Sequence, residues 1–156
     1  MRRYFRFRVL APAAVAILAG IQLIRPARNP GAAEGPQDLA HRYPVPADVR
    51  RLLVAACYDC HSNHTDYPWY ANVQPVGWWL ANHVSSGKDH LNFSAFGAYG
   101  PHQAARKLDG IADQVDEGKM PLRSYLWMHP AARLTQAERA KIVDWAQDLH
   151  DKLAPE

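Results

Sequence analysis

The pentapeptide Cys57-Tyr58-Asp59-Cys60-His61 constrains this chain more than any other feature of its sequence. Two thiols three positions apart at the end of a helix can both reach one edge of a flat macrocycle, and the adjacent histidine then faces its metal. C-x-x-C-H is the attachment signature of a c-type haem. The motif therefore predicts one covalent haem c, with Cys57 and Cys60 forming the thioethers and His61 as the proximal iron ligand.

Three other uses of a C-x-x-C pair remain open at this point. A dithiol redox pair is expected within a βαβ unit, and no sustained strand pattern is present. A zinc site would need histidines to complete it, because the chain has only these two cysteines. A disulfide between residues three apart closes too short a loop to stabilise the fold much.

The distal iron ligand can be narrowed by counting methionines. Apart from Met1, the chain contains only Met120 and Met128. Met120 lies between Gly118 and Pro121, in a loop that can present a thioether without a helix in the way. We therefore expect Met120 to be the distal iron ligand. Met128, an open site or a histidine are the alternatives, and the histidines concerned are His64, His83, His90 and His102.

The proximal histidine is also expected to have a backbone partner. A metal-bound histidine usually donates its other ring N–H to a carbonyl or carboxylate, which fixes the orientation of the ring. Turns at Pro68 and Pro75 are the candidates that the sequence offers for such a carbonyl next to His61. The sequence does not choose between them.

Apolar residues recur at helical spacing in four segments, and the fold is predicted to be all-α. The first three helices are expected at residues 46–56, at 75–84 with Gly87 as the stop, and at 103–117. The fourth opens on the capping box Thr135-Gln136-Ala137-Glu138 and buries the stripe of Ile142, Trp145, Ala146 and Leu149.

The net charge of +3 and the pI near 9.0 would suit a nucleic-acid partner, but the charge is unevenly distributed. No acidic residue occurs before Glu34, whereas the remainder of the chain has 12 basic residues against 15 acidic ones. No nucleic-acid partner is expected, since the basic excess comes entirely from six N-terminal arginines. These are Arg2, Arg3, Arg6, Arg8, Arg25 and Arg28.

The N-terminal segment has the pattern of a membrane anchor. Residues 9–24 carry no charge, arginines flank the run, and no small-x-small cleavage site follows it directly. We expect residues 1–28 to form an N-terminal transmembrane helix with a cytoplasmic N-terminus. Residues 29–45, rich in proline and glycine, are expected to be a tether, and residues 46–156 a c-type haem-binding domain in the periplasm or outside the cytoplasmic membrane.

Beyond these single features, the chain resembles the class I c-type cytochromes and, more closely, the membrane-anchored haem-binding domain (haem_bd) proteins of bacteria. The resemblance rests on residues 21–26, 57–70, 74–79, 90–94, 117–122 and 144–146. It implies a small cytochrome c-like helical domain around a single covalent haem. The family carries the label of haem binding and brings no definite reaction with it.

The expected function is one-electron transfer by a membrane-anchored mono-haem cytochrome whose redox partner the sequence does not identify. No catalytic residue is predicted, and an electron carrier is favoured over an enzyme. The alternative is a peroxidase-like enzyme or a gas or redox sensor with an open or displaceable sixth site. That alternative needs a distal histidine or arginine, and the candidates are His83, His90 and Arg123.

Overall fold

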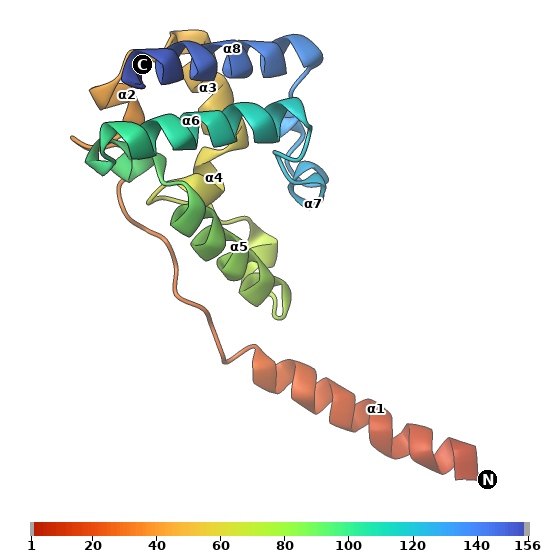
Figure 1. Cartoon of the computed structure of the whole chain (residues 1–156). Helices are drawn as coiled ribbons and strands as arrows, with labels where there is room; N and C mark the ends of the chain where they lie inside the picture. Colours follow the sequence, from red (N-terminus) through yellow and green to blue (C-terminus); the bar gives the residue numbers. More distant parts are fainter. Residues whose placement is uncertain (1, 155–156) are drawn as a thin grey trace.

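The computed structural model describes residues 2–154, with side chains described from residue 10 onward. Every regular element in this part of the chain is helical, which confirms the all-α prediction, and the one β-bridge joins Pro30 and His64 (Figure 1). The α-helices are α1 (Arg2–Ile21), α2 (Leu39–Arg42), α3 (Ala47–Ala56), α4 (Tyr58–His61), α5 (Val76–His90), α6 (Pro101–Asp116), α7 (Arg123–Leu126) and α8 (Gln136–Leu153). The short 3₁₀ turns are η1 (Trp69–Asn72), η2 (Phe93–Ala98) and η3 (Pro130–Ala132).

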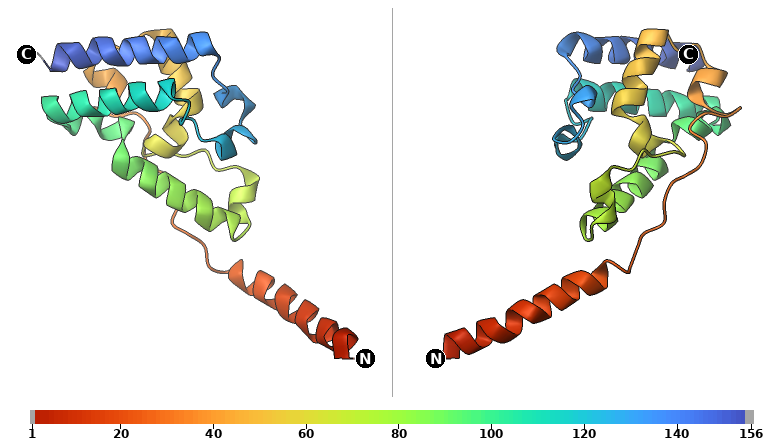
Figure 2. Two further views of the ribbon diagram at one scale, coloured as in Figure 1. Left: turned by 45° about the vertical axis from the view of Figure 1, so that its right-hand side comes forward. Right: turned by 180° about the vertical axis from the view of Figure 1, so that it is seen from behind.

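Helices α6 and α8 lie side by side and form the most extensive helix pair of the domain (Figures 1 and 2). The predicted capping box opens α8: the backbone N–H of Glu138 donates to Thr135 Oγ1 at 3.2 Å, and the backbone N–H of Thr135 donates to Glu138 Oε2 at 2.8 Å. Two of the N–H groups left free at a helix start are thus satisfied, and the helix has a defined first residue.

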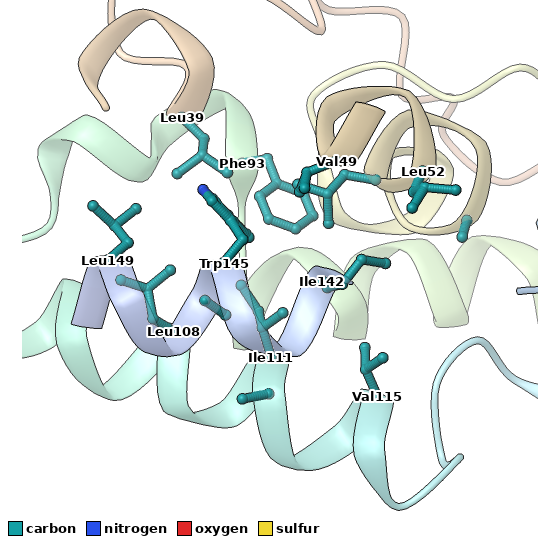
Figure 3. Close-up of a cluster of buried hydrophobic side chains, with 14 of the residues drawn as sticks. Leu39, Val49, Leu52, Phe93, Leu108, Ile111, Val115, Ile142, Trp145 and Leu149 are labelled. Carbon is teal, nitrogen blue, oxygen red and sulfur yellow. The ribbon is translucent and has the colours of Figure 1, made fainter. Parts of the chain in front are cut away.

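The core lies where α3 and α2 pack against this pair, and its side chains point toward one another (Figure 3). The predicted stripe of α8 is buried, and the apolar face of α6 meets it. Phe93, from η2, is also part of this core. The labelled members in Figure 3 are Leu39, Val49, Leu52, Phe93, Leu108, Ile111, Val115, Ile142, Trp145 and Leu149.

Helix α5 is longer than expected, because Gly87 does not end it. The helix continues to His90, and Gly87 instead lies where α5 crosses the motif. A Cβ atom at Gly87 would come within 2.7 Å of the backbone oxygen of Cys60, closer than real Cβ atoms approach. The glycine therefore allows a close approach of two backbones rather than a helix stop.

Replacing Gly87 with alanine is expected to destabilise the domain by roughly 1–3 kcal/mol, because the added methyl group forces α5 away from the Cys60 carbonyl. Chemical denaturation followed by circular dichroism measures this loss. Gly35→Ala is the matched control, since nothing lies within 4 Å of a Cβ atom there, and it should change stability by less than about 0.5 kcal/mol. Equal effects of the two substitutions would contradict the close-approach explanation.

Residues 29–45 were expected to form an extended tether, but the structure packs them onto the domain. They contain α2, and Asp38 and Leu39 are both 0% exposed. Asp38 caps α2 by accepting from the N–H of Ala40 at 2.9 Å, and it also accepts from the hydroxyl of Tyr58 at 3.1 Å. Further along, Trp145 Nε1 donates to the carbonyl of Pro44 at 3.2 Å. Buried polar contacts hold this segment in place despite its many prolines.

Helix α1 projects away from the rest of the molecule in every view (Figures 1 and 2). Within the described part of the chain, no helix combines the length and apolar character needed to cross a membrane. The transmembrane helix predicted within residues 1–28 is therefore not supported. The uncharged run at residues 9–24 would extend roughly 24 Å as a helix, less than the ~30 Å of a typical hydrocarbon core.

Candidate functional site

The C-x-x-C-H motif lies at the junction of α3 and α4. Cys57, with φ −131° and ψ −40°, interrupts the helical path between them, and the backbone N–H of His61 donates to its carbonyl at 3.0 Å. This single turn brings Cys57, Cys60 and His61 to the wall of the same cleft. Both thiols are free and partly exposed.

The cleft beside the motif consists of two adjoining hollows with volumes of about 440 and 420 Å³. Each is large enough for a cofactor-sized ligand. The hollows share six residues, which marks them as two halves of one cleft; these are Ala56, Cys57, His61, His90, Gln114 and Met120. The first hollow is further lined by Leu91, Phe93, Arg106, Lys107, Gly110, Ile111 and Val115. The second is further lined by Asp59, Cys60, Asn82, His83, Ser86, Gly87, Pro121, Leu122 and Tyr125.

His61 is held by a carbonyl that the sequence did not suggest. Its Nδ1 atom lies 3.1 Å from the backbone oxygen of Leu91, just after α5, rather than near Pro68 or Pro75. A carbonyl oxygen only accepts, so Nδ1 carries the proton and Nε2 keeps a free lone pair. Burial also lowers the pKa of His61, which favours the neutral imidazole that a metal ion binds.

The two thiols are poor nucleophiles in this environment. Burial raises the pKa of Cys57 to about 12, and burial together with the negative charge of Asp59 raises the pKa of Cys60 to about 11. Reactive dithiol pairs have lowered pKa values instead, so this finding argues against thiol redox chemistry. The zinc alternative gains no support either, because no three His, Cys, Asp or Glu side chains cluster in the described part of the chain.

Met120 lies in a loop that follows α6 and lines both hollows, as Cys57 and His61 do. The positive φ of Gly118 (67°) turns the chain, and the backbone N–H of Met120 donates to the carbonyl of Gln114 at 3.0 Å. From α8, Arg139 Nη1 donates to the carbonyls of Met120 at 3.2 Å and Val115 at 3.0 Å. These contacts hold Met120 at the point where the two hollows meet.

The other ligand candidates are distributed unevenly around the cleft. His83 and His90 line it, whereas Met128 lines neither hollow and is 54% exposed. Of the remaining candidates, His64, His102 and Arg123 line neither hollow. The structure therefore brings Cys57, Cys60, His61 and Met120 together, with His83 and His90 as the neighbouring alternatives.

Comparison with known proteins adds one finding. A protein-family model described as a haem-binding domain matches residues 16–148, most of the chain. The chain belongs to the haem-binding domain family. Searches of curated proteins and of solved structures found no match. Family membership supports haem binding by this chain.

The lining of the cleft in this haem-binding domain suits a haem in its chemistry. Its walls are mostly apolar, as a large flat macrocycle requires, and Phe93, Ile111 and Val115 link it directly to the core. The free Nε2 lone pair of His61 and the thioether of Met120 are both ligands that haem iron accepts. The two thiols border the same space, so the residues present fit the group.

One contact that supports the motif could not be foreseen. The hydroxyl of Tyr125, in α7, donates to Asp59 Oδ2 at 2.7 Å, and Asp59 Oδ1 accepts from the backbone N–H of Asp66 at 3.1 Å. Burial raises the pKa of Tyr125, which keeps its hydroxyl protonated as the donor. The pair joins α7, just after the Met120 loop, to the middle of the haem-binding domain's motif.

A second unforeseen contact involves Asn29, in the segment expected to be a tether. Its side-chain amide donates to the carbonyl of Ser62 at 2.9 Å and to Thr65 Oγ1 at 3.0 Å. Its oxygen accepts from Lys88 Nζ of α5 at 2.8 Å. Asn29 thus ties the residues that follow the motif to α5, and no local sequence pattern signals this role.

Proposed function

We propose that this chain is a mono-haem c-type cytochrome domain that carries single electrons. Cys57 and Cys60 attach the haem through thioethers, His61 is the proximal ligand and Met120 the distal ligand. The observation that supports this proposal best is that His61 and Met120 line both hollows of the cleft that Cys57 also borders. A haem held by His61 and Met120 would supply one-electron transfer chemistry, and this pair of ligands would leave no position free for a substrate.

The chain's own residues supply orientation and exclude water. The bond from His61 Nδ1 to the carbonyl of Leu91 fixes the imidazole plane, and Arg139 holds the backbone of Met120 from α8. Phe93, which is 1% exposed, forms an apolar wall beside His61, with ring centroids 6.3 Å apart. A dry, apolar surrounding of this kind favours the ferrous state, which carries less charge, and so raises the reduction potential.

We further propose that the domain works at the outer side of the cytoplasmic membrane, delivered there by its N-terminal segment. Covalent haem attachment takes place after export, and the basic residues that precede the uncharged run suit an export signal. Several apolar side chains of α1 are exposed and are not packed against the domain, which supports an association with lipid. They include Leu10, Val15, Ile17 and Leu18, each more than half exposed.

A haem-stained denaturing gel of cell fractions tests attachment and location together. The full chain of 17.5 kDa is expected to give one stained band in the membrane fraction, and the purified protein should show the sharp α-band of low-spin ferrous haem. An unstained protein would refute covalent attachment, and a stained cytosolic band would refute the location. A stained protein with a high-spin spectrum would refute the histidine–methionine pair.

One observation favours the alternative of an open or displaceable sixth site. His83 lines the second hollow together with Met120, and its Nδ1 atom donates to the carbonyl of Trp79 at 2.8 Å, which leaves Nε2 free. A peroxidase-like enzyme or a gas sensor needs such a distal group. Carbon monoxide binding by the reduced protein at a position that no methionine occupies would favour this function over electron transfer.

A further inference from the structure

The two halves of the cleft differ in charge. Arg106 and Lys107, on α6, line the first hollow, and no aspartate or glutamate of the described residues does. Asp59 lines the second hollow, and no lysine or arginine whose side chain the structure describes does so. His90 borders both hollows and so does not distinguish them. The first hollow is therefore the half of the cleft that attracts an anionic group.

The two cysteine thiols are also distributed unequally between the two hollows. Cys57 lines both hollows, whereas Cys60 lines only the second. In a haem, the vinyl groups that form thioethers and the two propionate carboxylates lie on opposite edges of the macrocycle. A haem attached at Cys57 and Cys60 thus has its vinyl edge toward the second hollow and its propionate edge toward the first.

We propose that Arg106 and Lys107 form the binding site for the haem propionates in the first hollow. The proposal rests on covalent attachment at Cys57 and Cys60 as proposed above. Charge and thiol position are separate observations, and both assign the same direction to the macrocycle. The opposite direction would bring the two carboxylates next to Asp59, which like-charge repulsion opposes.

The two cations have different roles at this site. Arg106 is exposed at the mouth of the hollow, and its planar guanidinium matches a carboxylate in a two-bond geometry. Lys107 is half-buried; its Nζ donates to the carbonyl of His90, and it lies 5.8 Å from the centroid of the Tyr99 ring. Arg106 is accordingly the main propionate ligand, and Lys107 adds a positive charge at a fixed position.

Helix α6 would then organise two parts of the site at once. Its middle carries Arg106 and Lys107, and its last turns carry Gln114, whose carbonyl holds the Met120 loop. A positive charge beside the propionates offsets their negative charge, which otherwise favours ferric over ferrous haem. Removing either cation should therefore lower the reduction potential.

The test compares Arg106→Gln and Lys107→Gln with Arg51→Gln, all in the full-length haem-loaded protein. Arg51 is an exposed cation on α3 that lines neither hollow, so its substitution removes the same charge elsewhere. Redox titration should show the equilibrium constant for reduction falling roughly three- to tenfold in the Arg106 variant and less than about twofold in the Arg51 variant. Resonance Raman spectra should show the propionate bending bands shifted in the Arg106 variant and unchanged in the Arg51 variant.

Further variants distinguish propionate binding by Arg106 from a general structural effect of the substitution. Another measurement tests covalent attachment of the haem by itself. Arg106→Lys should restore most of the potential but not the Raman bands, because lysine keeps the charge and loses the planar fork. Propionate bands that respond to Asp59→Asn, and not to Arg106→Gln, would overturn the proposal by reversing the haem. A wild-type protein without a haem-stained band would instead refute covalent attachment, the proposed function itself.

Discussion

Replacing Cys57 and Cys60 together with serine is expected to abolish the haem-stained band completely. Serine preserves the size of the side chain, but its hydroxyl does not form the thioether that survives denaturation. The haem-stained gel measures the loss, and circular dichroism checks that the helices are retained. Both cysteines are partly exposed at the cleft wall, although Cys57 also packs against the core, so the fold should tolerate a change that keeps the side-chain volume.

The single variants provide the graded control for this experiment. Cys57→Ser and Cys60→Ser each leave one thiol beside the cleft and should retain a weaker stained band. A double variant that stains like the wild type would show that the haem is attached elsewhere or by other chemistry. Loss of staining together with loss of helical structure would instead assign the thiols a structural role.

Replacing Met120 with alanine is expected to convert a low-spin haem into a high-spin one and to lower its reduction potential. The methyl group of alanine cannot coordinate iron, and the weak-field or open site that remains no longer favours the ferrous state. Absorption spectra of the oxidised and reduced protein measure the change of spin state. Redox titration measures the change in potential.

Met128→Ala is the matched control, because it removes the same thioether from an exposed position outside the cleft. Its spectrum should equal that of the wild type. An unchanged spectrum of the Met120 variant would reject Met120 as the distal ligand. His83, which lines the second hollow, would then be the next candidate for that ligand. The same comparison therefore separates an electron carrier from a haem protein with a histidine or an open position above the iron.

Local sequence patterns were enough to predict the helical fold and most of the candidate site residues of this protein. The C-x-x-C-H motif identified the residues at the cleft wall, and helical periodicity with the capping box at Thr135 predicted the all-α fold and the start of α8. Counting methionines selected Met120, which lies in the cleft, over the exposed Met128. Each of these features depends on residues within a turn or two of each other, and a sequence displays such relations directly.

Only the tertiary structure decided the rest, because those contacts join residues that are far apart along the chain. The carbonyl that orients His61 belongs to Leu91, and the Tyr125–Asp59 bond joins residues 66 positions apart. The sequence predicted Gly87 as a helix stop, whereas the structure shows that a glycine is needed there because the Cys60 backbone lies so close. Only the tertiary structure places the cations of α6 in the wall of the hollow that Cys57 and His61 also line. A sequence specifies such neighbours through the packing of the whole core, and no short pattern carries that information.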